Sequence, residues 1–239
     1  MSWAAHEFET YVIQKHLGVR ASYLAIVAGT YAPDAFTKWY VYGVDKGPIQ
    51  FGASDAVQFH RGWPGAGFTH SILFCVAIAL VVFAVTRSRG WGLGVLAGSL
   101  AHVITDTSDT VGSMLFFPWT QHFTTGLWKY AAEAGRYDDA AAYYSSFGLL
   151  MDVAWLGIAL LGWKVFTADY FRTVVVPADG AWSWIGKRFS EQAMLVFYRT
   201  SLFYGTTRMV FWTGWAHVLH SYAWDLSYGG PYWIQGVYL

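Results

Sequence analysis

Charged side chains are scarce in this chain: Asp, Glu, Lys and Arg make up 13% of its 239 residues, against about 25% in an average soluble domain. This deficit excludes an ordinary soluble domain and predicts a membrane protein, as does the mean hydropathy of +0.32. Lys and Arg together number 15, as do Asp and Glu. No excess of positive charge therefore indicates a nucleic acid as partner.

Cysteine is nearly absent, and a cleavable leader is not recognisable. The single cysteine, Cys75, lies inside an apolar run, which excludes an intramolecular disulfide and argues against a catalytic thiol. Residues 1–16 lack the basic start and the long apolar core of a secretory signal peptide. We therefore expect membrane insertion to depend on internal segments.

Aromatic residues, in contrast, are abundant. They make up 20% of the chain and include 14 Trp and 16 Tyr, which fits the aromatic belts at the two interfaces of a bilayer. A chain of this length suits one domain. We predict a single membrane domain over residues 1–239, an all-α polytopic helical bundle with about four to five membrane-embedded helices plus interfacial helices.

The clearest transmembrane segment is residues 68–86, which carry His70 near their start and are followed by Arg87 and Arg89. The next segment, 91–106, predicts a helix that returns antiparallel to the first. The other helices that we expect are an amphipathic one at 4–18, a short tilted one at 21–33, a second clear span at about 145–168 and a long stretch at about 190–223.

The returning helix carries a repeated four-residue step, at Gly90, Gly94, Gly98, His102 and Asp106. Residues four apart are neighbours on one helical face, and small residues at this spacing let another helix approach closely. A histidine and a carboxylate one turn apart have the spacing of metal ligands, although such a pair can also simply form a hydrogen bond. Asp109 adds an oxygen just beyond.

The antiparallel hairpin brings His102 and Asp106 to the same membrane face as His70. Asp34, which follows the short helix 21–33, can reach the same layer. The positive charges lie at the other ends of the expected spans, at Arg87, Arg89, Lys164, Arg172, Lys187 and Arg188. The positive-inside rule assigns those ends to the cytoplasm, so we expect the histidine layer to face outward.

Two segments of the chain, GSLAHVITDTSDTVGSMLFFP and HRG followed by FTHS, form a recognisable pair of motifs. They resemble the HLxxDxxTxxG…P signature and the HRGxTHS motif of the LexA-binding, inner membrane-associated family of metal-dependent hydrolases. Ala32-Pro33-Asp34 resembles its PDxD motif, and His6 resembles its N-terminal histidine. The resemblance covers residues 1–120, while residues 121–239 read as additional helices with an aromatic C-terminal extension.

The chain also departs from the family pattern. Phe36 replaces the second aspartate of PDxD, and five extra residues, WPGAG, separate HRG from THS. Asp109 occupies the place of the family's threonine and could restore the lost carboxylate. The sequence leaves two possibilities open: a site rebuilt around Asp109, or a fold that is kept without turnover.

The resemblance implies a divalent metal that acts on an ester or phosphoryl group, and mixed histidine and aspartate ligands suit zinc, or alternatively manganese or iron. The location of the site at a membrane face, with aromatic interfacial surface around it, favours an amphiphilic ester or phosphoester substrate. The resemblance also implies Asp106 and Arg61 as catalytic residues, although Arg61 could equally anchor a lipid headgroup. The implied metal ligands are His70, His102, Asp106 and Asp34, followed by His60, His6 and Asp109.

Two other functions remain open at this stage. One is a catalytically inactive scaffold that serves as an accessory subunit of a larger membrane complex, with contacts to other membrane subunits through the aromatic C-terminal region. The other is a subunit that ligates haem or a chlorophyll-type pigment through its histidines. In every case we expect membrane lipids as partners and localisation in the inner (plasma) membrane as a multi-pass protein.

Overall fold

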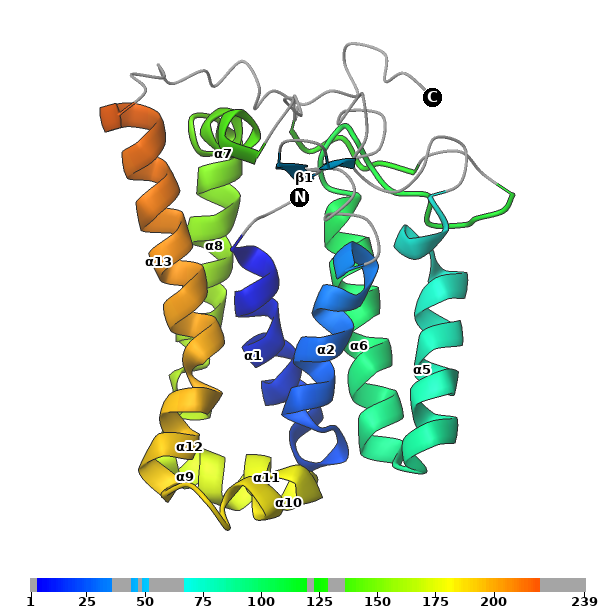
Figure 1. The fold of residues 1–239 in the computed structure, drawn as a ribbon, viewed down its shortest axis with the longest axis vertical. Helices are drawn as coiled ribbons and strands as arrows, with labels where there is room; N and C mark the ends of the chain where they lie inside the picture. Colours follow the sequence, from blue (N-terminus) through cyan, green and yellow to red (C-terminus); the bar gives the residue numbers. More distant parts are fainter. Residues whose placement is uncertain are drawn as a thin grey trace.

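The computed structural model describes residues 4–35, 44–46, 49–51, 67–119, 123–128 and 136–219. The longest helices in this part of the chain run along the long axis of the molecule (Figure 1). They are α1 (Ala5–Leu17), α2 (Tyr23–Ala35), α5 (Ile72–Thr86), α6 (Arg89–Asp106), α8 (Phe147–Leu161) and α13 (Thr200–Gly214).

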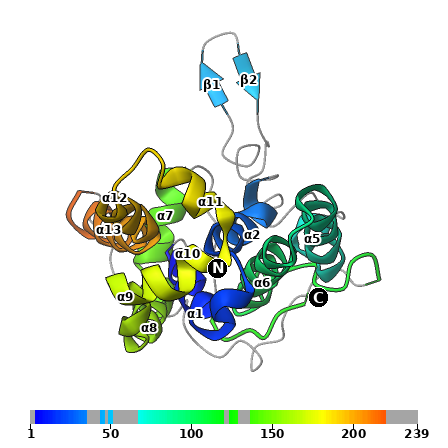
Figure 2. The same cartoon turned by 90° about the horizontal axis from the view of Figure 1, so that it is seen from below.

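Shorter elements connect these helices. They are η1 (Gly18–Arg20), η2 (Phe68–His70), α7 (Arg136–Tyr144), η3 (Trp163–Phe166), α9 (Ala168–Tyr170), η4 (Phe171–Val175), α10 (Val176–Ala178), α11 (Gly180–Ile185), α12 (Glu191–Tyr198) and η5 (Trp215–Leu219). Strands β1 (Val44–Lys46) and β2 (Ile49–Phe51) form an antiparallel pair that projects from the helices in Figure 2. The predicted helical class is confirmed, and this small hairpin is the unexpected addition.

Helices α5 and α6 form the predicted antiparallel hairpin. Ser71 caps the start of α5 by accepting a hydrogen bond from the backbone N–H of Phe74, and Ser88 does the same for α6 through Trp91. Between the helices, Arg87 adopts a left-handed conformation with φ of 55°, which ends α5 as a C-terminal cap. The caps explain why the chain reverses at these residues.

The glycines of α6 bring α2 into close contact, as their spacing predicted. A Cβ atom on Gly98 would lie 2.3 Å from the carbonyl oxygen of Ile26, and one on Gly29 would lie 2.3 Å from that of Val95. Real side chains cannot occupy those positions. Glycine on both helices therefore allows their backbones to touch, and this fixes the distance between α2 and α6.

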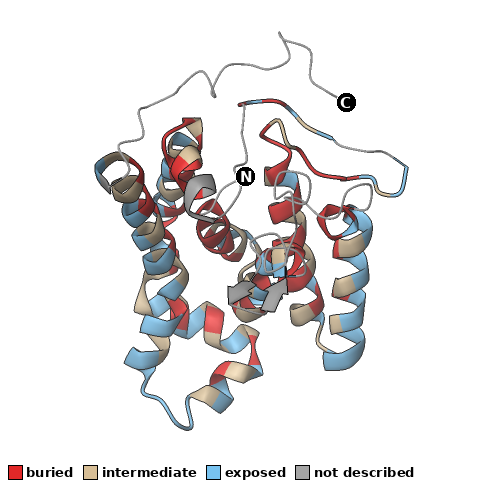
Figure 3. Ribbon diagram, turned by 45° about the horizontal axis from the view of Figure 1, so that its top comes forward, coloured by how far each residue is buried: buried red, intermediate tan, exposed pale blue. Residues whose placement is uncertain are grey.

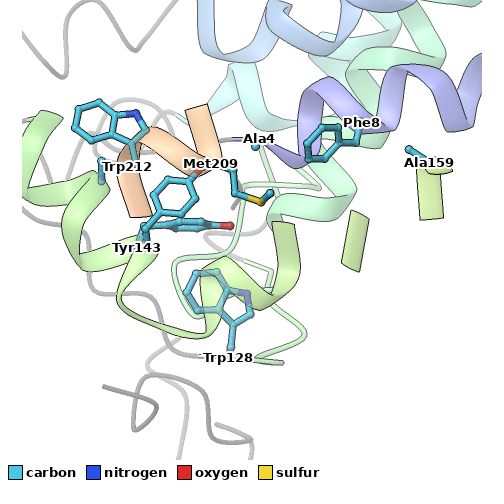
Figure 4. Close-up of a cluster of buried hydrophobic side chains, with 9 residues drawn as sticks. Ala4, Phe8, Trp128, Tyr143, Ala159, Met209 and Trp212 are labelled. Atoms are coloured by element: carbon cyan, nitrogen blue, oxygen red, sulfur yellow. The ribbon is translucent and has the colours of Figure 1, made fainter. Parts of the chain in front are cut away.

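Helix α1 lies inside the bundle. The sequence allowed an interfacial or a packed helix at residues 4–18, and the structure shows the packed one, with Phe8 and Tyr11 fully buried. Figure 3 shows the buried residues concentrated on the inner helices and the exposed ones on the outer faces. Phe8 belongs to the same core cluster as Trp128, Tyr143 and Met209, which come from other parts of the chain (Figure 4).

The expected full-length spans are not found. None of the helices in the described ranges combines the length and the apolar character needed to cross a bilayer. Segment 68–86 divides into η2 and a 15-residue α5 because Ser71 caps the start of the helix, and the stretch after residue 190 divides at Arg199 into α12 and α13. The cap at Ser71 is a hydrogen bond to the backbone, which hydropathy does not register.

Candidate metal centre

Four ionisable side chains selected from the sequence meet at one end of the helix bundle. Asp34 lies in the last turn of α2, and His70 ends η2, just before α5. His102 and Asp106 lie one turn apart at the end of α6. Because α5 and α6 are antiparallel, the start of one is beside the end of the other (Figure 1). The glycine-mediated packing of α2 on α6 then brings Asp34 to the same place.

The nitrogen and oxygen atoms of these side chains alternate around a common centre. His70 Nε2 lies 3.3 Å from Asp34 Oδ1 and 3.5 Å from Asp106 Oδ2. His102 Nε2 lies 3.7 Å from Asp34 Oδ1 and 3.5 Å from the same oxygen of Asp106. Each of the two imidazoles thus faces both carboxylates.

These separations suit ligands that share a cation better than direct hydrogen bonds. Hydrogen bonds from N–H to oxygen measure about 2.7–3.2 Å. Two ligands of a tetrahedral zinc ion, with bonds of about 2.0–2.1 Å, lie about 3.3 Å apart. His102 is buried, and neither of its ring nitrogens makes a hydrogen bond to a residue within the described ranges. The donor set of two nitrogens and two oxygens therefore fits a divalent cation.

The centre is buried except at Asp34. The side chains of His70, His102 and Asp106 are at most 2% exposed, whereas that of Asp34 is 25% exposed. Asp34 is therefore the most accessible of the four side chains, and the two histidines are shielded from solvent. Thr69 Oγ1 lies 3.1 Å from Nδ1 of His70, and this contact holds the ring with Nε2 towards the carboxylates.

His6 adds a third imidazole to the cluster. Its ring stacks on that of His102, with centroids 3.8 Å apart and planes 13° apart. Its Nδ1 lies 3.2 Å from Glu9 Oε2, and its Nε2 lies 3.5 Å from Asp106 Oδ1. Burial alone would lower the pKa of His6, but the carboxylates of Glu9 and Asp106 outweigh it and raise the pKa to about 10. A cation that binds to Nε2 of His6 therefore has to displace a proton.

The other predicted site residues are placed differently. Asp109 Oδ1 accepts hydrogen bonds from the backbone N–H groups of Val111 and Gly112, so this carboxylate stabilises the turn after α6. It is not in either of the two groups of possible metal ligands found in the described ranges, which are His6, His102 and Asp106, and Asp34, His70 and His102. His60, Arg61 and Phe36 lie outside the described residues.

Two buried acids of α1 were missed from the sequence. Glu9 lies beside His6, and the spacing of three residues on one helix was the signal that could have found it. Glu7 is fully buried and accepts hydrogen bonds from Arg208 and from the hydroxyl of Tyr31. Arg208 is 201 residues away along the chain, so no local pattern indicated this pair.

Comparison with known proteins connects the chain to a membrane family. The family model described as YdjM inner membrane protein matches residues 5–171. The match includes all the helices that supply the centre, and it extends beyond residue 120, where the recognisable motifs end. No curated protein and no solved structure matches the chain.

Proposed function

The matched region covers more than half of the chain, so the chain belongs to the YdjM inner membrane protein family. From the geometry of the centre we propose that the protein is a metal-dependent hydrolase of the inner membrane. Its substrate in this proposal is an amphiphilic ester or phosphoester that reaches the centre at the membrane face. One observation carries the proposal: the four nitrogen and oxygen atoms of His70, His102, Asp34 and Asp106 at ligand spacing.

Each residue of the centre has its own role in this proposal. His70, His102, Asp34 and Asp106 would hold the cation, and their mixed nitrogen and oxygen atoms suit zinc and also manganese or iron. When bound, such a cation polarises an ester or phosphoryl oxygen and lowers the pKa of a water molecule towards neutrality. Asp34, as the most exposed of the four side chains, is the ligand nearest to an approaching substrate in this proposal. Asp106 faces His6 as well as His70 and His102, so the assembly of the centre depends most on this residue.

The substrate class is inferred from the surface around the centre. Helix α5, which begins two residues after His70, exposes Leu73 near the centre and Leu80, Val81 and Val85 further along, each more than half exposed. Exposed aliphatic side chains along a helix of an inner membrane protein favour contact with lipid. A substrate with an apolar tail could therefore lie along this face while its polar group reaches the centre. Binding of an anionic oxygen by Arg61 stays a prediction.

Metal analysis combined with an activity assay tests the proposal. Detergent-purified protein should contain zinc, manganese or iron and hydrolyse a p-nitrophenyl ester or phosphoester. His102→Ala should lose both the metal and the activity, because this ring supplies a ligand. His16→Ala is the matched control, since His16 is an exposed histidine on α1, and it should keep both. Folding of each variant is checked by circular dichroism.

The alternatives predict other results from the same preparation. A protein that co-purifies with further membrane subunits, without metal, supports the accessory scaffold. Visible absorbance from a bound chromophore supports a haem or pigment subunit. Either result contradicts the hydrolase if His102→Ala leaves the co-purification or the absorbance unchanged.

A further inference from the structure

The carboxylate of Asp106 lies beside two stacked imidazoles and offers a different oxygen to each. Oδ2 faces His102 Nε2, and Oδ1 faces His6 Nε2, both at 3.5 Å. The rings of His6 and His102 are stacked 3.8 Å apart. Two nitrogen donors therefore point at two oxygens of one carboxylate, side by side.

This is the arrangement expected of a carboxylate that bridges two cations. In two-metal sites the cations lie about 3.5–4 Å apart, which matches the separation of the two stacked rings. A cation held in front of each imidazole would have its own oxygen of Asp106. The stacked rings therefore have the right spacing for a pair of cations. A single cation between His70, His102, Asp34 and Asp106 would leave His6 without a role as a ligand.

Glu9 supports this assignment for His6. Metal-bound histidines usually donate the hydrogen of the other ring nitrogen to a carboxylate or carbonyl. His6 Nδ1 is within hydrogen-bond distance of Glu9 Oε2, at 3.2 Å, while the contact of its Nε2 with Asp106 is longer. Glu9 is 1% exposed, and its other oxygen makes no hydrogen bond in the described ranges of the chain. A buried carboxylate at this position fixes Nε2 as the nitrogen that faces the centre.

The charges of the cluster leave one negative charge uncompensated by a single cation. Asp34, Asp106 and Glu9 carry three negative charges, of which one divalent cation offsets two. Buried charge is costly unless it is compensated. A second divalent cation would bring four positive charges against these three, whereas a proton on His6 would balance the remaining one, and this is the competing explanation that the experiment has to separate.

We propose that the centre binds two divalent cations bridged by Asp106, with His6 as a ligand of the second cation and Glu9 as the residue that positions His6. This inference rests on the proposed function for its first cation, held by His70, His102, Asp34 and Asp106. The second site is new: it adds a ligand from α1 and so joins α1 to α6 through the bridging carboxylate.

Metal stoichiometry tests the inference. Detergent-purified protein is dialysed against Mn²⁺ and its metal content is measured by mass spectrometry. Wild type and His16→Ala should hold two ions per chain. His6→Ala should hold one, and so should His6→Phe, which keeps a ring stacked against His102 but has no nitrogen. Glu9→Gln, which preserves the side-chain volume, should weaken the second ion by about 10–100-fold.

Electron paramagnetic resonance provides a second measurement on the same samples. Two Mn²⁺ ions that share a carboxylate should give an exchange-coupled spectrum in wild type, and the six-line spectrum of an isolated ion in His6→Phe. One ion per chain in wild type, unchanged by His6→Phe, overturns the second site and leaves the hydrolase with a single cation, His6 then acting as a charged partner of Asp106. No ion in wild type overturns both proposals.

Discussion

At the residue scale, the buried pair of Glu7 and Arg208 is the contact on which the placement of α1 depends most. The Glu7 side chain is completely buried, that of Arg208 is 18% exposed, and Tyr31 donates a second hydrogen bond to the carboxylate. Burial raises the pKa of Glu7 although Arg208 opposes this shift. Helix α1 carries His6 and Glu9 next to Glu7, so this pair also fixes one side of the centre.

Arg208→Met should therefore destabilise the protein strongly, because it leaves Glu7 as an uncompensated buried charge. Breaking one partner of a buried ion pair costs about 3–5 kcal/mol, which should appear as a lower midpoint in thermal unfolding followed by circular dichroism. Arg172→Met is the control, since its partner Glu191 is on the surface and little change is expected. The double variant Glu7→Gln, Arg208→Met should recover much of the loss. Equal midpoints for Arg208→Met and wild type would contradict this role.

The sequence predicted part of this residue-scale picture. His102 and Asp106 are detectable because ligand pairs one turn apart recur on helices, and His70 follows from the antiparallel return of the chain. Glu9 was not predicted to be buried, because an acid on an amphipathic helix usually faces water. Glu7 was missed for a different reason: its partner Arg208 is brought to it only by the packing of α1 against α13, which no local sequence pattern indicates.

At the scale of elements, the contact between α2 and α6 positions Asp34. The two backbones touch at Gly98, where a Cβ atom would lie 2.3 Å from Ile26 O and 2.7 Å from Thr30 N. Thr30 is one turn before Asp34 on α2. Any change that separates the helices at this point also moves that carboxylate away from His102.

Gly98→Leu should push α2 away from α6 and lower both stability and cation affinity. Overpacking of a closely packed contact costs about 1–3 kcal/mol, measurable as a lower unfolding midpoint, and metal titration should show weaker binding. The matched control is Gly157→Leu on α8, because a Cβ atom there meets nothing within 4 Å. If Gly98→Leu unfolds and binds metal like wild type, the glycine contact does not position the centre.

The helix boundaries show where hydropathy is insufficient. The turn of the α5–α6 hairpin was predicted correctly because Arg87, Ser88 and Arg89 interrupt an apolar run. The ends of the spans were not, because Ser71 and Arg199 end or begin helices through backbone hydrogen bonds. Capping is a local hydrogen-bonding effect, and an average of side-chain hydropathy over 19 residues does not register it.

At the scale of the whole molecule, the centre and one group of positive charges, which includes Arg87 and Arg89, lie at opposite ends. The α5–α6 turn, with Arg87 and Arg89, and the short helices α9–α11 lie at one end of the bundle, while the ligands lie at the other (Figure 1). The alternation of segments along the sequence predicted this separation. Positively charged ends of inner membrane proteins stay in the cytoplasm, so the outward-facing centre expected from the sequence stays a prediction.

Cysteine labelling in intact cells tests this orientation. In a Cys75→Ala background, Trp119→Cys places an exposed thiol in the segment after Asp106, and Lys187→Cys places one just after α11. A maleimide that does not cross membranes should label position 119 in intact spheroplasts, and position 187 only after permeabilisation. The reverse pattern would place the centre on the cytoplasmic side. Labelling of both positions before permeabilisation would show that the two ends of the bundle lie on one side of the membrane. The ligands and the α9–α11 end are separated by the length of the helices, so this result would contradict the prediction that the helices cross the membrane.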